Sequence, residues 1–258
     1  PAVVRLFQQV FPPKKWADNE VALYCGPQFT LWGPETLKNP GPSFIGGSEE
    51  AMIHASEALV KKGWKVTVYA DPPEDQIKEI NGITWKPHFE FNPGDDFNIL
   101  VYLRSVSYTD AQAKAKKTYL WCHDVLQPLE FTPERLDRIT KIIVLSQTQR
   151  ECLPDVPDDK FIISSNGFVE YLPEVKPENN PHWCVYSSSY DRGLQNLLEI
   201  WPEVKKAVPD AELHCFYGWQ LFFTFYKDNP ERMAWMNKMN ELMKLPGITH
   251  HDRVPQEE

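Results

Sequence analysis

Short apolar segments alternate with polar, helix-like segments along the first part of the chain. Each apolar segment carries little charge, which is typical of strands that are buried on both faces of a parallel sheet. The predicted strands are 20–26, 64–70, 97–103, 117–122, 141–146 and 160–164, with 83–91 as a further strand at the edge of the sheet. Strands that alternate with helices predict a doubly wound α/β domain, whose ligands bind at the carboxyl ends of the strands.

The most regular helical pattern follows the glycine pair Gly46-Gly47. We expect this helix to be capped by Ser48, to end at Gly63 and to bury one apolar stripe. The stripe consists of Ala51, Met52, Ala55, Ala58 and Leu59. Shorter helices are predicted over 109–116, 132–140 and 147–153.

Residues 171–181 have no periodicity and are rich in proline, which predicts a linker. After it the alternation starts again, with strands predicted over 183–188, 211–217 and 248–254 and helices over 194–207 and 229–245. We therefore expect two domains, 1–175 and 176–258. A parallel sheet this small leaves an apolar face open, so we expect the second domain to be incomplete and the chain to be a fragment.

The glycine pair Gly46-Gly47 is a candidate anion site. Without Cβ atoms the backbone is open to close approach, and the amides at a helix start can bind phosphate. A plain tight turn is the alternative, and for an isolated glycine pair it is the commoner case. Glu49 and Glu50 disfavour an anion there unless their side chains point away.

The composition and charge of the chain disfavour several classes of function. The formal net charge is −9, which gives no basic surface for nucleic acid. The sequence has no apolar run long enough to span a membrane and no visible signal peptide. The five cysteines include no CxxC pair and lie mostly in predicted strands, which indicates reduced, buried thiols in a cytoplasmic protein rather than disulfides or a zinc site.

Four segments together resemble the retaining, nucleotide-sugar-dependent GT-B glycosyltransferases of family four. They are 26–70 with the glycine pair, WCHDV at 121–125, IIVLSQTQRECL with KFIISSNGF at 142–168, and 186–218, which starts YSSSYDRG. The resemblance covers about residues 20–254. It implies an α/β fold of GT-B type, with two Rossmann-like domains that each contain a parallel sheet, the second being incomplete here.

The resemblance also implies site residues. His123 would contact the transferred sugar, and Gly46 and Gly47 would take part in donor binding. Arg192, just before Gly193, would neutralise the donor diphosphate, where a guanidinium can donate two parallel hydrogen bonds. Ser187 and Ser188 stand where many members carry a second cation. The asparagine and glycine at 166–167 are interpreted as a structural turn.

The expected reaction moves a sugar from a nucleotide-sugar donor to a glycan or lipid-linked acceptor with retention. No cofactor or metal is expected, since no apolar strand ends in an Asp-x-Asp pair. The family's paired-glutamate motif lies beyond residue 258, so we expect weak or no catalysis. A peripheral membrane contact stays open.

Two other functions also stay open. A nicotinamide-dependent oxidoreductase or epimerase needs G-x-G-x-x-G directly after a strand, whereas the glycine pair here follows a long loop. A non-catalytic sugar- or protein-binding module could use the aromatic residues Trp219, Phe222, Phe223, Phe225 and Tyr226.

Overall fold

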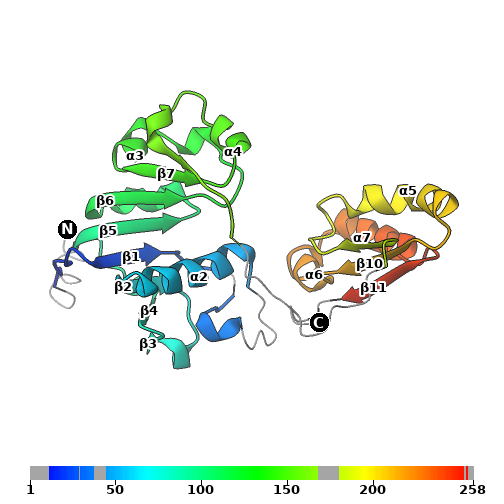
Figure 1. Ribbon diagram of the computed structural model, residues 1–258, viewed down its shortest axis with the longest axis horizontal. Helices are drawn as coiled ribbons and strands as arrows, with labels where there is room; N and C mark the ends of the chain where they lie inside the picture. The colour runs from blue at the N-terminus through cyan, green and yellow to red at the C-terminus, as the bar shows by residue number, and fades with distance from the viewer. Residues whose placement is uncertain (1–11, 29, 38–44, 168–179, 253, 255–258) are drawn as a thin grey trace. The chain divides into compact units, whose positions relative to one another are not determined.

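The chain folds into two compact units, residues 1–169 and 170–258, each described here by itself. The structure is a computed structural model (Figure 1), and it describes residues 12–28, 30–37, 45–167, 180–252 and 254. The predicted domain boundary between residues 175 and 176 lies outside the described residues, as does most of the predicted linker.

The N-terminal unit is built on an eight-stranded sheet of order β3-β4-β2-β1-β5-β6-β7-β8. Its neighbouring strands are parallel except for the antiparallel pair β3–β4. β1 pairs with β2 on one side and with β5 on the other. The strand order therefore switches sides at β1, and open α/β sheets bind ligands at such a switch point. The strands are β1 Glu20–Tyr24, β2 Lys65–Ala70, β3 Glu79–Ile80, β4 Ile83–Pro87, β5 Asp96–Leu103, β6 Lys114–Trp121, β7 Lys141–Val144 and β8 Phe161–Ile163.

One face of this sheet is covered by the long helix α2, Gly47–Lys61. Of the predicted stripe, Met52 is buried and Leu59 packs against the core, whereas Ala58 is exposed and the buried side also includes Ile53 and Ser56. The predicted cap is also wrong, because Gly46 rather than Ser48 precedes the first helical residue. The buried side of α2 packs against β2 and β4. These contacts, rather than the positions of the alanines, determine which side of the helix is buried.

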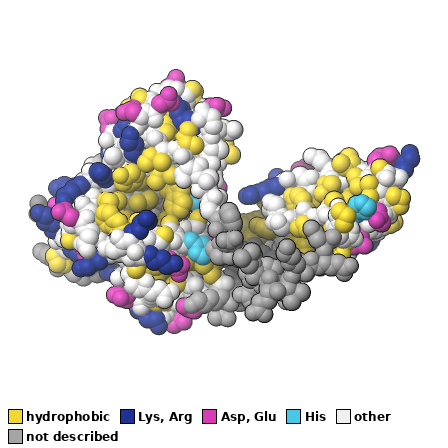
Figure 2. Space-filling model, in the orientation of Figure 1, with side chains coloured by type: hydrophobic (Ala, Val, Ile, Leu, Met, Phe, Trp, Pro, Cys, Tyr) yellow, Lys and Arg dark blue, Asp and Glu magenta, His cyan; other side chains and the backbone are white. Residues whose placement is uncertain are grey.

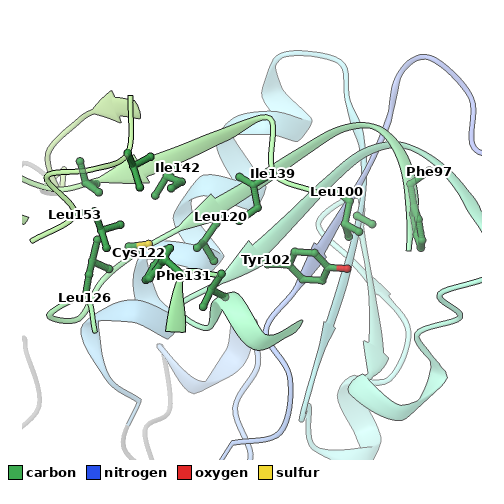
Figure 3. Packing of buried hydrophobic residues seen from close by; sticks show 14 of the residues in the cluster. Phe97, Leu100, Tyr102, Leu120, Cys122, Leu126, Phe131, Ile139, Ile142 and Leu153 are labelled. Atoms are coloured by element: carbon green, nitrogen blue, oxygen red, sulfur yellow. The ribbon is translucent and has the colours of Figure 1, made fainter. Parts of the chain in front are cut away.

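The opposite face packs an aromatic-rich core under short helices and loops (Figure 3). Its central members are Phe97, Leu100, Tyr102, Leu120, Phe131 and Ile142, all at most 9% exposed. Among the described residues of this unit, the α-helices besides α2 are α3 Pro133–Asp137 and α4 Gln147–Glu151. The 3-10 turns are Pro34–Thr36, Glu74–Gln76, His88–Glu90, Val106–Ala111, Pro128–Glu130 and Asp158–Lys160.

The predicted helix 109–116 is wrong. A 3-10 turn ends at Ala111, Gln112 follows in the left-handed region at φ +53°, and β6 then begins at Lys114. Alternating lysine and alanine suit a polar helix locally, but pairing with β5 overrides that preference.

Part of the α2 face remains open to solvent. Val101 on β5 and Tyr119 on β6 are paired in register and half-buried, and Ile99 and Trp121 are half-buried beside them. Figure 2 shows the resulting band of hydrophobic side chains over β5 and β6.

The C-terminal unit has a three-stranded parallel sheet of order β11-β10-β9. The predicted strands and helices are confirmed, and the helix 194–207 matches α5 at both ends. The prediction missed α6, whose aromatic residues divide between core and surface: Phe222 is 9% exposed, Phe223 49% and Phe225 54%. The elements are β9 Trp183–Tyr186, α5 Leu194–Ala207, β10 Glu212–Phe216, α6 Gln220–Tyr226, α7 Pro230–Leu242 and β11 Ile248–Asp252.

The cysteines are all free. Cys25, Cys122 and Cys215 are buried, as expected for strand residues, whereas Cys184 on β9 is exposed and Cys152 is half-buried.

Candidate functional site

The candidate site of the N-terminal unit lies where β1, β5 and β6 end. Parallel pairing brings the carboxyl ends of these strands to one edge of the sheet. Arg104 directly follows β5, and His123 and Asp124 follow β6. A guanidinium bridge joins this edge to the start of α2, since Arg104 contacts Asp124 Oδ2 through Nε at 2.6 Å and Glu49 Oε1 at 3.5 Å.

Gly46 and Gly47 form the N-terminus of α2, but a carboxylate already lies against them. A Cβ placed on Gly46 would be 2.6 Å from Glu49 Oε2, whereas a Cβ on Gly47 would meet no atom within 4 Å. The Glu49 side chain is only 10% exposed. Glu49 therefore does not point away from the glycine pair, and its charge is offset by Arg104. An anion-binding role for Gly46 and Gly47 stays a prediction.

His123 is half-buried, and its Nε2 atom has no hydrogen-bond partner among the described residues. Its ring lies beside Trp121, with ring centroids 4.6 Å apart. Burial lowers the pKa of His123, Asp124 raises it and Arg104 lowers it further, so the imidazole is neutral near neutral pH. A neutral ring offers one donor and one acceptor to a ligand.

The loop after β6 is fixed from two sides. Asp124 accepts from Arg104 through its carboxylate and, through its backbone carbonyl, from the Gln149 side-chain amide at 2.6 Å. Gln149 also accepts the backbone N–H of Leu145 at 2.7 Å. The position of His123 is thus tied to β5 and to the start of α4.

The analysis of the sequence missed Arg104. Its backbone has φ +70°, and the N–H of Ser105 donates to the Leu103 carbonyl at 2.8 Å, which makes a tight three-residue turn centred on Arg104. The Arg104 N–H donates to the Trp121 carbonyl, also at 2.8 Å. Such a conformation is costly for a residue with a side chain and collects at functional sites. The available signal was a charged residue placed directly after a buried strand.

Gly26, at the end of β1, is a second residue that the sequence did not reveal. It has φ +64°, and a Cβ there would overlap the Tyr108 hydroxyl. That hydroxyl donates to the Cys25 carbonyl at 3.3 Å. Only glycine fits both the backbone conformation and the close approach of the ring.

A carboxylate also fixes the start of the long loop after β1. Asp71, which follows β2, accepts the Gln28 N–H at 2.6 Å and hydrogen-bonds the ring of His88, which follows β4. These contacts tie the beginning of the predicted acceptor-side loop to two strand ends.

The other predicted site residues belong to the C-terminal unit, in the loop between β9 and α5. Ser187 and Arg192 are exposed, and Ser188 is half-buried. Among the residues that the structure describes, none forms an ion pair with the Arg192 guanidinium. Gly193 precedes α5 at φ +105°, a conformation that favours glycine.

Tyr190 anchors this loop, although no pattern in the sequence indicated it. It is 2% exposed, and its hydroxyl accepts the Gly218 N–H at 3.0 Å and lies 2.6 Å from His250 Nε2. Burial raises the pKa of Tyr190 to about 12. The loop is therefore hydrogen-bonded to the turn after β10 and to the middle of β11, while Arg192 in the same loop is exposed.

The described residues contain no cluster of histidine, cysteine and carboxylate side chains suited to a metal ion. Within the same ranges, every helix is too short or too polar to cross a membrane.

Comparison with solved structures bears on the fold. The chain is similar to sucrose-phosphate synthase from Thermosynechococcus elongatus, with 15% sequence identity and a TM-score of 0.58 over 93% of this chain and 71% of that one. The fold is GT-B. A glycosyltransferase from Rickettsia africae ESF-5 is also similar, with 10% identity and a TM-score of 0.54 over 94% of this chain and 69% of that one. Both matches extend over both units, and at these identities they bear on the fold alone. No family model matches the sequence, and neither does any curated protein.

Proposed function

We propose that this chain is a nucleotide-sugar-dependent glycosyltransferase. The observation that carries the proposal is the likeness, over more than nine-tenths of the chain, to two structures whose names describe sugar transfer. The placement of charged and polar side chains at the carboxyl ends of the strands supports it, because that edge is where α/β sheets bind ligands.

In this proposal the C-terminal unit binds the donor. Arg192 neutralises the diphosphate, and the hydroxyls of Ser187 and Ser188 donate hydrogen bonds to it. Stabilising the departing diphosphate is the main electrostatic task in sugar transfer from such a donor. The solvent-facing guanidinium of Arg192, on a loop that Tyr190 holds in place, supports this assignment.

The N-terminal unit contributes His123 and the glycine pair. We propose that neutral His123 hydrogen-bonds the transferred sugar through Nε2, and that the amides of Gly46 and Gly47 contribute to donor binding. Nε2 is buried and has no hydrogen-bond partner among the described residues, so it is an unsatisfied polar atom that a sugar hydroxyl would satisfy. The acceptor is a glycan or a lipid-linked acceptor, the reaction proceeds with retention, no metal or other cofactor takes part, and the protein works in the cytoplasm.

A thermal-shift panel with UDP-, GDP- and ADP-sugars beside NAD and NADP tests the proposal. A ligand at 100 times its dissociation constant stabilises a protein by about 2.7 kcal/mol, which such a panel detects. We expect a shift with one nucleotide sugar that is lost in Arg192→Ala and kept in Arg232→Ala, a matched control cation on α7 of the same unit.

Other outcomes would contradict the proposal. A shift with NAD or NADP alone would favour an oxidoreductase, and sugar binding that Arg192→Ala spares would favour a non-catalytic module. No shift with any nucleotide sugar, in a protein that melts cooperatively, would count against donor binding by this chain.

A further inference from the structure

Arg104 occupies a strained backbone position that only its side-chain contacts explain. The residue directly follows β5, the strand beside β1, and has φ +70°. Glycine would adopt this conformation without strain. We therefore attribute the arginine at this position to the contacts of its guanidinium group. Its two partners come from different elements, Glu49 from the first turn of α2 and Asp124 from the loop after β6.

The bridge also balances charge. Glu49 is 8% exposed and lies against Gly46, so without a cation it would put an uncompensated carboxylate at the helix start. Asp124 is 56% exposed and adjoins His123, where an unpaired carboxylate would favour the protonated ring. One guanidinium meets both requirements.

We propose that Arg104 is a positioning residue: through Glu49 and Asp124 it holds the start of α2 and the His123 loop together and offsets the charge of both carboxylates. It touches no reacting atom in this role. The functional meaning rests on the proposed sugar-transfer activity, in which His123 must be neutral and fixed, but the electrostatic effect is measurable without any ligand.

The charged groups that act on His123 come from two elements. Asp124 in its own loop raises the pKa of His123, and Arg104 from the end of β5 lowers it, on top of the lowering by burial. Removing Arg104 should therefore raise the pKa of His123, and removing Asp124 should lower it. Loss of packing alone does not produce shifts of opposite sign.

The test is a pH titration of the histidine ring protons by NMR, with His123→Gln used to assign the resonance. In Arg104→Gln we expect the pKa of His123 to rise, because a positive charge that lowers it is removed, and in Asp124→Asn to fall, because a negative charge that raises it is removed. Arg104→Lys should restore the value in large part. Arg135→Gln is the matched control, since Arg135 pairs bidentately with Asp110 at 2.9 and 2.6 Å in the same unit. In this variant the pKa of His123 should equal that in the unaltered protein.

The proposal is overturned if His123 titrates alike in the unaltered protein and in Arg104→Gln. If Arg104→Gln does not fold, Asp124→Asn decides, because that side chain is exposed: an unchanged or raised pKa of His123 would refute the bridge. The titration uses no nucleotide sugar, so its failure is distinct from a failure of the proposed transferase activity in the ligand panel.

Discussion

The hydroxyl of Tyr190 offers a sharp test of how the candidate donor loop is held. In Tyr190→Phe the ring, its burial and its edge contact with Trp219 at 4.7 Å are kept, and only the oxygen is removed. That oxygen accepts the N–H of Gly218 and pairs with His250. The substitution therefore removes the polar connection from the loop 187–193 to Gly218 after β10 and to His250 within β11.

The expected cost follows from the amide that loses its acceptor. A buried N–H without a partner costs about 1–3 kcal/mol, and we take about 2 kcal/mol for Gly218. For a unit the size of 170–258, each kcal/mol lowers the melting temperature by about 4–8 °C, so we expect a fall of about 8–16 °C. The same free energy corresponds to about 30-fold faster hydrogen exchange of the Gly218 amide.

Hydrogen exchange read at Gly218, together with thermal unfolding, measures both effects. Tyr226→Phe is the matched control, because Tyr226 lies in the same unit and its hydroxyl makes no hydrogen bond among the described residues. If Tyr190→Phe exchanges and melts like Tyr226→Phe, the hydroxyl does not hold the loop and the reasoning is refuted.

Three further predictions concern the N-terminal unit. Arg150→Met should lower its melting temperature by about 2–12 °C, because the buried Val156 carbonyl loses its donor at a cost of about 1–3 kcal/mol, whereas the exposed Asp158 stays solvated. Thermal unfolding beside Arg135→Met, which should melt nearly like the unaltered protein, checks this. Since burial lowers the pKa of His123 in the folded state, only the unfolded chain binds that proton between the folded pKa and about 6.5. The contribution of neutral His123 to the free energy of unfolding is present above pH ~6.5 and is lost as the pH falls. Denaturant unfolding across that range should therefore show a smaller loss of stability in His123→Gln than in the unaltered protein. An equal dependence on pH in the two proteins would contradict the lowered pKa. Gly26→Ala should cost about 1–3 kcal/mol from its left-handed backbone alone, while Gly47→Ala should be neutral or slightly stabilising; equal urea midpoints for the two variants would contradict this.

Much of the framework was predictable because its signals are local. Strands such as β1, β5 and β7 appear as continuous apolar runs, which is typical of strands in a parallel sheet. The helix α5 was placed at both ends, since its amphipathic period is strong and a glycine precedes it. In contrast, the aromatic run of α6 has no period, and the lysine-rich start of β6 is a strand only because β5 lies beside it.

The candidate site was predictable in location more than in composition. The strand end that carries His123 is visible in the sequence, whereas the roles of His123 and Arg192 come from the family resemblance and stay predictions. Arg104 depends on contacts with Glu49 and Asp124 that only the sheet order brings about. Tyr190 lies among serines and charged residues, and nothing in that pattern shows that its ring turns inward.

The charge arrangement also explains why the two candidate cations are assigned different roles. In a chain of formal net charge −9, an anionic donor needs a local cation that is not already neutralised. Arg104 faces two carboxylates, one of them nearly buried, so an incoming phosphate would compete with partners that the fold holds in place. Arg192 has no such partner in the described part of the chain, and a phosphate there would displace only water. We therefore propose the diphosphate site at Arg192 and a positioning role for Arg104 at the edge that carries His123.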